Sequence, residues 1–157
     1  MEFLGEHNKR KVYWWNYSGE TLNELPLEPW LCFAIVDELP EFDLFERFAK
    51  TAIKKNVYEF KVFGNLSSKL DDLFDEIMVI EEVINKSDSI EVMTTWHDKE
   101  GFASAFWQSF YATCVPESVN RDTIKIVCCH FQNRNLEKEL KIFINRFNDG
   151  WIPSENE

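Results

Sequence analysis

The chain has 157 residues, of which 45% are hydrophobic and 15% are aromatic, and its formal net charge is −11. This length suits one domain with one core, and the apolar content excludes extensive disorder. The acidic balance argues against nonspecific binding to nucleic acid or to an anionic membrane, because both depend on Lys and Arg. A basic protein partner, or simple solubility, fits the charge better.

The N-terminus and the cysteines indicate the cellular compartment. Residues 1–8 show no basic head followed by an apolar stretch, so the sequence predicts no signal peptide. No run approaches the roughly 18 apolar residues of a transmembrane helix. The four cysteines form no C-x-x-C pair, and we expect reduced thiols that pack as small hydrophobic groups. We therefore expect a cytoplasmic protein.

Strand-like and helix-like segments alternate along the chain. Residues 1–28 are predicted to form an N-terminal arm or an edge strand, because an aromatic run precedes a loop with Gly and Pro. Strands are predicted over 30–36, 57–63, 90–96 and 123–131. Amphipathic periodicity predicts helices over 43–55, 67–77, 101–114 and 136–147, the first capped by Asp43 and the second followed by an ambiguous 78–80 segment.

This alternation predicts the fold class. Strands that alternate with helices form βαβ units, which build a mainly parallel sheet with helices on both faces. We expect an α/β three-layer sandwich over residues 29–150, with a polar tail over 151–157. The sheet should have four or five strands in the flavodoxin- or receiver-like order 2-1-3-4, counted from the strand at 30–36. In that order the ligand crevice lies between strands one and three.

Polar residues follow each predicted strand, and they should meet at the carboxyl edge of the sheet. The candidate binding residues there are Asp37, Glu38, Asn65, Thr95, Trp96, His97 and Asp98. Candidates for acid–base work are Asp37, His97 and His130, with Asp37 or Glu38 orienting His97. In the simpler interpretation these are loop residues, and Asp98 caps the next helix. The spacing matches no metal motif, so neither a metal nor another cofactor is expected.

The sequence also predicts how the side chains of Trp96 and His97 pack. Consecutive residues of an extended strand point to opposite faces of the sheet. We expect Trp96 to be buried against a helical layer and His97 to face the crevice.

The sequence lacks three common catalytic or phosphate-binding motifs, and one segment resembles a known family. The sequence contains no G-x-S-x-G elbow, no G-x-G-x-x-G and no Walker A loop. Residues 35–40 resemble the first strand and acidic pair of response-regulator receivers. That family needs an aspartate where Thr94 or Thr95 stands, and a lysine where Cys129-His130 stands. Phosphotransfer by that route is therefore rejected, and only the fold analogy remains.

A second resemblance covers about residues 30–132. It rests on Val92-Met93-Thr94-Thr95-Trp96-His97, on Phe106-Trp107 in the next helix, and on the strand at 123–131. In these features, and in a Ser-Ser-Lys-Leu-Asp-Asp stretch at 67–72, the chain resembles a family of small bacterial proteins, a DUF7684-like domain of unknown function. The resemblance implies an α/β fold and a bacterial origin, and it implies no activity.

The acidic residues gather at 37–43 and along 71–82. Acids in small α/β proteins can steer association with basic partners, and residues 65–75 resemble, over a short stretch, a helix of barstar-type nuclease inhibitors. A solvated face is the simpler alternative. We expect an acidic interaction protein that binds a protein partner of basic charge, such as a bacterial immunity or defence accessory protein, rather than an enzyme. The alternative is a small enzyme or ligand-binding domain that uses Asp37, Thr95, His97 and His130.

Overall fold

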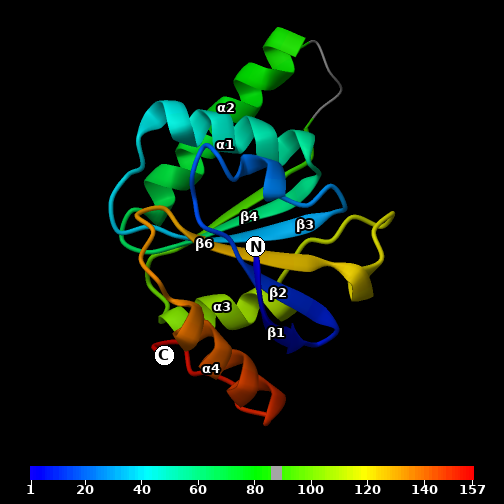
Figure 1. Cartoon of the computed structure of the whole chain (residues 1–157), viewed down its shortest axis with the longest axis vertical. Coiled ribbons are helices and arrows are strands. Elements are labelled where there is room, and N and C mark those ends of the chain that lie inside the picture. Colours follow the sequence, from blue (N-terminus) through cyan, green and yellow to red (C-terminus); the bar gives the residue numbers. More distant parts are fainter. Residues whose placement is uncertain (86–89) are drawn as a thin grey trace.

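The protein is a three-layer α/β sandwich, as the alternation of strands and helices predicts. The computed structural model describes residues 1–85 and 90–157, and within them one six-stranded sheet lies between two layers of helices (Figure 1). The strands are β1 (Glu2–His7), β2 (Arg10–Trp14), β3 (Trp30–Ile35), β4 (Val57–Phe63), β5 (Met93–His97) and β6 (Lys125–His130). The α-helices are α1 (Phe42–Lys54), α2 (Ser67–Asn85), α3 (Phe102–Tyr111) and α4 (Glu137–Asn148).

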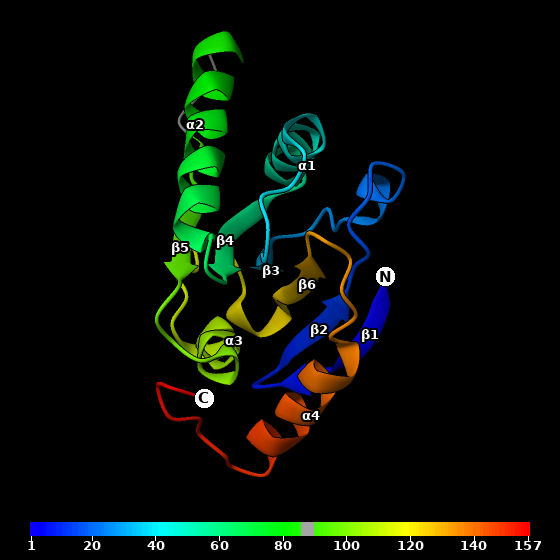
Figure 2. The same ribbon diagram turned by 90° about the vertical axis from the view of Figure 1, so that its left-hand side faces the viewer.

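The sheet runs in the order β1-β2-β6-β3-β4-β5 and is parallel except for β1, which pairs antiparallel with β2. From β3 the chain moves through β4 to β5, and α1 and α2 cover one face of the sheet along this path. The chain then reverses, so that α3 packs on the opposite face and β6 enters beside β3 (Figure 2). This reversal places the topological switch point, where ligands gather in such sheets, between β3 and β6.

The fold class is confirmed, but the strand order differs from the expected 2-1-3-4. When β3, β4, β5 and β6 are numbered one to four as in the prediction, the observed order is 4-1-2-3. β5 lies at the edge beside β4, and β6 lies in the interior. Burial explains the difference. Every residue of β6 after Lys125 is buried, as suits a central parallel strand. In β5, Thr94, Thr95 and Trp96 are all at least partly exposed, which suits an edge strand.

Residues 1–28 supply two strands of the same sheet. The aromatic segment forms β2, which is not an edge strand, because it pairs with β1 on one side and with β6 on the other. Asn8 and Lys9 join β1 to β2 with φ angles of 49° and 62°, the conformation of a two-residue type I′ hairpin. Trp15 and Tyr17 are buried and carry the segment after β2 into the core.

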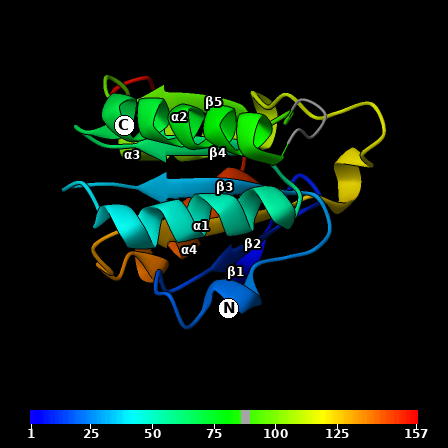
Figure 3. The ribbon, with the colours of Figure 1, turned by 90° about the horizontal axis from the view of Figure 1, so that it is seen from above.

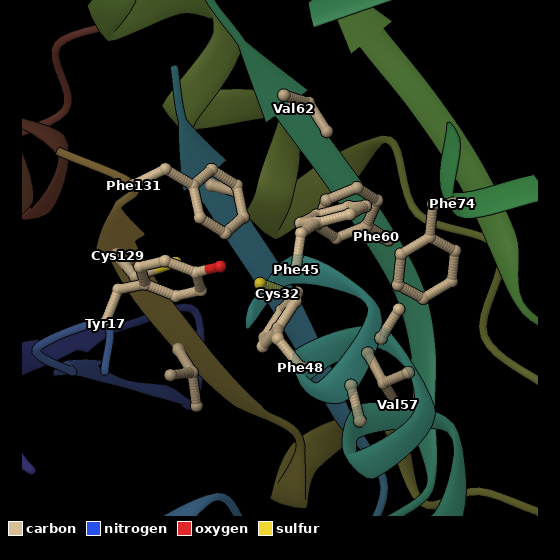
Figure 4. Close-up of a cluster of buried hydrophobic side chains, with 14 of the residues drawn as sticks. Tyr17, Cys32, Phe45, Phe48, Val57, Phe60, Val62, Phe74, Cys129 and Phe131 are labelled. Carbon is tan, nitrogen blue, oxygen red and sulfur yellow. The ribbon is translucent and has the colours of Figure 1, made fainter. Parts of the chain in front are cut away.

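The core between the sheet and the α1–α2 layer is rich in phenylalanine (Figure 4). Phe60 of β4 stacks on Phe74 of α2 with ring centroids 4.4 Å apart. Phe45 of α1 meets Phe131, which follows β6, with centroids 5.5 Å apart. Such aromatic pairs add to the burial of apolar area. Cys32 lies in this core, and burial raises the pKa of its thiol, so the thiol stays protonated and serves as a packing group.

The tail after α4 returns to the start of α3. Trp151 packs against aromatic residues of α4. The Gly101 amide then donates to the backbone oxygen of Glu155 at 2.8 Å, and the Ala103 amide donates to that of Glu157 at 2.7 Å. A Cβ atom on Gly101 would lie 2.0 Å from the backbone carbon of Glu157. Only glycine leaves room for the tail at this point.

The helices follow the predicted amphipathic segments, but their ends differ. α1 begins at Phe42 and no side chain caps it, so Asp43 lies in its first turn instead. Asp98 does not cap α3, whose N-cap is Gly101 without a side-chain hydrogen bond. The ambiguous 78–80 segment is helical, since α2 continues to Asn85. Among the described residues, no helix combines the length and apolar character needed to cross a bilayer.

Candidate functional site

Four side chains line up across the sheet near its carboxyl edge. The register pairs Ile35 with His130 on one side and with Phe63 on the other, and it pairs Phe63 with His97. Neighbouring strands lie about 4.8 Å apart, so the three steps from His130 to His97 span roughly 14 Å. The two histidines therefore belong to separate clusters, and Asp37 joins only the cluster of His130.

His130 and Asp37 form a hydrogen-bonded pair at the switch point. His130 Nε2 lies 3.1 Å from Asp37 Oδ2, and the Gln132 amide donates to His130 Nδ1 at 3.1 Å. Because Nδ1 accepts, the proton is on Nε2, and it is donated to Asp37. Burial lowers the pKa of His130, although the Asp37 carboxylate opposes this. His130 is therefore neutral at pH 7, and with both nitrogens engaged it orients Asp37.

Gln132 ties the loop after β3 to the loop after β6. Its side-chain oxygen accepts from the Asp37 amide at 3.0 Å, and its side-chain nitrogen donates to the backbone oxygen of Glu38. Asn133 follows with a φ of 54°, a left-handed conformation that asparagine tolerates well. Gln132 thus fixes the backbone of Asp37, and His130 orients its carboxylate.

A pocket of about 170 Å³ lies above this pair. Its apolar lining comes from the ends of β3 and β4 and from the starts of α3 and α4: Ile35, Phe63, Phe102 and Leu136. Its polar lining comprises Asp37, His130, Arg134 and Glu139. The Arg134 Nη1 atom lies 3.8 Å from Asp37 Oδ2, so the pair is loose and exposed to solvent. The pocket occupies the place where open α/β sheets bind ligands.

A second polar cluster is buried between β4, β5 and the end of α3. Lys61 Nζ lies 3.0 Å from Glu59 Oε1, and both residues are only 1% exposed. The ammonium also donates to Thr95 Oγ1 at 3.3 Å and to the Ala112 carbonyl at 3.4 Å. The second Glu59 oxygen accepts from the Cys114 amide at 3.2 Å. This satisfies the two buried charges and leaves Lys61 unsuited to act as a nucleophile.

His97 completes this second cluster. Its Nε2 atom lies 3.5 Å from Lys61 Nζ, and its Nδ1 atom lies 3.2 Å from Glu100 Oε1. Lys61 can only donate, so Nε2 accepts and Nδ1 donates to Glu100. Burial, and then the Lys61 charge, lower the pKa of His97. His97 is therefore a neutral bridge between a buried lysine and a partly exposed glutamate.

The expected orientation of Trp96 and His97 is reversed. Trp96 is 52% exposed, whereas His97 is 5% exposed. The two residues do point to opposite faces. His97 faces the α3 side, where it contacts Lys61 and Glu100, and Trp96 shares the face of Thr94, which bonds Asp75 of α2, but stays exposed on the edge strand. Glu38, Asn65 and Asp98 are exposed at their strand ends.

Several residues of these clusters were not among the sequence candidates. Glu59 and Lys61 are two positions apart in a strand, so they share a face. Opposite charges on one face of an otherwise apolar strand are a signal for a buried pair. Gln132 and Arg134 follow His130 closely, but their roles depend on the conformation of the loop, which no periodicity reports. Among residues 1–85 and 90–157, no three His, Cys, Asp or Glu side chains gather as a metal site.

A third feature lies on the surface of α2. Residues three and four positions apart share one side of a helix. The side turned away from the core is acidic in its first half and aliphatic in its second, and we call it the α2 outer stripe. Its members are Asp72, Glu76, Val79, Ile80, Val83 and Ile84, with Asp75 at its border, where it accepts a hydrogen bond from Thr94 of β5. Its four aliphatic residues are 47–72% exposed, and this half of α2 projects beyond α1 (Figures 1 and 2).

Comparison with known proteins identifies a family but adds no activity. No curated protein and no solved structure matched the chain. The family model for a domain of unknown function, DUF7684, matches residues 12–147. The match begins in β2 and ends in α4, so it spans most of the sheet, the Asp37–His130 pair and the α2 outer stripe. The chain therefore belongs to the DUF7684 family.

Proposed function

We propose that this protein is an acidic interaction domain that binds a basic amphipathic segment of another protein through the α2 outer stripe. The observation that carries the proposal is the row of exposed aliphatic side chains at Val79, Ile80, Val83 and Ile84. A helix that packs on a sheet normally turns a polar face to water. An aliphatic row on that face is typical of a surface that is covered by a partner.

The acids beside this row select the partner. Glu76 is exposed about one turn before Val79, and Asp72 about two turns before it, on the same side of α2. A segment that covers the whole stripe therefore meets aliphatic groups at one end and carboxylates at the other. Lys or Arg beside an apolar row complements this pattern, and the net charge of −11 speeds the approach of such a partner.

The same pattern disfavours a second copy of the chain as the occupant. If two α2 helices pack antiparallel, the carboxylates of each face the aliphatic groups of the other, which buries charge without a partner. If they pack parallel, carboxylates face carboxylates. Either arrangement of two copies costs free energy, whereas the binding of a basic segment avoids this cost.

The setting that we propose is the bacterial cytoplasm, with a role as an immunity or defence accessory protein. The small size, the acidic charge and the lack of a nucleophile motif support this setting. Figure 3 shows α1 and α2 side by side over the sheet, with α2 at the outer side.

The test uses a labelled peptide about five helical turns long with a Leu face and a Lys face, and a matched peptide with Glu in place of Lys. We expect fluorescence anisotropy to show binding of the Lys peptide only. The double variant Val79→Ser/Val83→Ser should weaken it at least about tenfold, because two aliphatic contacts are lost. The control Ile142→Ser, at an exposed position on α4, should bind as the wild type does.

A second arm tests the charges. The variant Asp72→Asn/Glu76→Gln should weaken binding and flatten its dependence on salt, because exposed charges are screened by ions. Equal binding of the Lys and Glu peptides, or equal binding by all variants, would contradict the proposal. A dimer in sedimentation that Val79→Ser/Val83→Ser converts to monomer would also contradict it, since a second copy would then be the occupant.

A further inference from the structure

We propose that the pocket between β3 and β6 binds a small zwitterion, a free α-amino acid with a branched aliphatic side chain. This inference is independent of the α2 outer stripe, which lies on the other helical layer. It rests on the position of the pocket, on its size and on the charges that line it.

The size limits the ligand to a small molecule. The volume of about 170 Å³ is small for a ligand pocket. A ligand of about six to nine heavy atoms fits such a space, whereas pockets for drug-sized ligands measure about 300–1,000 Å³. A nucleotide or a peptide would fit this pocket only in part.

The charges of the pocket favour a ligand with an ammonium group. Asp37 and Glu139 are acidic, Arg134 is basic, and His130 is neutral, so the lining carries one net negative charge. Among the described residues, the side-chain contacts of the Asp37 carboxylate go to Oδ2. The Oδ1 atom is thus in place to accept from an ammonium in a charge-assisted hydrogen bond.

Arg134 supplies the place for the carboxylate of the ligand. Its guanidinium has several donors but only a loose contact with Asp37, at 3.8 Å. The start of α3 would be another place for an anion. There, however, the Gly101 and Ala103 amides already donate to the backbone of the tail. The anionic group therefore turns toward Arg134.

The remaining wall accepts an aliphatic side chain. Ile35, Phe63, Phe102 and Leu136 line it, and Phe63 stacks on Phe102 with ring centroids 5.2 Å apart. A branched aliphatic group fills such a wall and loses no hydrogen bonds on leaving water. His130 donates from Nε2 and accepts at Nδ1, so a metal ion has no imidazole lone pair to bind here.

The experiment titrates the protein with three probes and follows amide and methyl resonances of Ile35 and Leu136 by NMR. The probes are L-leucine, isoamylamine, which lacks the carboxylate, and 4-methylpentanoate, which lacks the ammonium. We expect saturable binding of L-leucine with a Kd of about 1 mM or below. Each of the other two probes should bind at least about tenfold more weakly, because one charged contact is lost.

Matched variants locate the site. Asp37→Asn should weaken L-leucine binding at least about tenfold, while Asp98→Asn, at the exposed end of β5 on the same edge of the sheet, should leave it unchanged. Arg134→Gln should erase the preference for L-leucine over isoamylamine. Its control is Arg121→Gln, at an exposed arginine in the short turn before β6. Val79→Ser should have no effect.

Three results would overturn the inference. These are no saturable binding of L-leucine, equal binding of L-leucine and isoamylamine by the wild type, and equal loss of binding in Asp37→Asn and Asp98→Asn. If the peptide does not bind to α2, the expected binding of L-leucine is unaffected, so each proposal can be refuted without the other.

Discussion

The buried pair of Lys61 and Glu59 leads to the sharpest prediction about stability. The two side chains meet at 3.0 Å and are almost completely buried. Lys61→Met keeps an aliphatic stem but leaves the Glu59 carboxylate without its cation. Breaking a buried ion pair from one side costs about 3–5 kcal/mol of unfolding free energy. The control Lys125→Met removes a more exposed ion pair with Glu28 at 3.2 Å and should cost less than about 1 kcal/mol.

Urea denaturation followed by circular dichroism measures these differences. The double variant Lys61→Met/Glu59→Gln removes both charges and should recover most of the loss, to within about 2 kcal/mol of the wild type. The Lys61 charge lowers the pKa of His97, so an NMR titration should show that pKa rising in Lys61→Met. A loss below about 1 kcal/mol in Lys61→Met, or a double variant no more stable than the single one, would refute the reasoning.

Two further predictions concern single positions. Trp96→Ala should cost less than about 1.5 kcal/mol because the side chain is 52% exposed, whereas Phe106→Ala, at a fully buried ring, should cost about 3–5 kcal/mol. Equal losses would contradict the placement of Trp96 at the surface. Burial, and then the nearby Asp75, raise the pKa of Asp71 from 3.8 to about 6. The native state then binds this proton more tightly than the unfolded state, so stability falls as the pH rises from about 4 to 6. Asp71→Asn should remove this dependence and gain about 1–2 kcal/mol at pH 7.5, and a stability profile parallel to that of the wild type would contradict it.

The helices and the fold class could be predicted because their signals are local. The apolar positions of α1 and α4 repeat at helical spacing within each segment, and the observed helices begin and end within one or two residues of the predicted bounds. The strand order could not be predicted in the same way, since it depends on pairings between distant segments. β1 gave no clear signal, because Gly5 interrupts its pattern and its pairing with β2 shifts register there.

The candidate site was predicted in part. Asp37 was recognised because it directly follows an apolar strand, and His130 because it lies at the end of one, and the structure places their side chains 3.1 Å apart. Their grouping with His97 depended on a strand order that places β5 beside β3. Once β5 lies at the edge, His97 joins Lys61 instead. The contribution of Gln132 depends on loop conformation, which a sequence pattern does not report.

The position of β6 at the centre of the sheet has a consequence for how the protein folds. β6 is the last strand along the chain, yet it pairs with both β2 and β3 and joins the N-terminal hairpin to the rest of the sheet. These pairings close very long loops, which slows folding. During synthesis, the edges of β2 and β3 that pair with β6 stay unpaired until residue 130 has left the ribosome. Nascent chains of this protein are therefore expected to aggregate more readily than the finished domain.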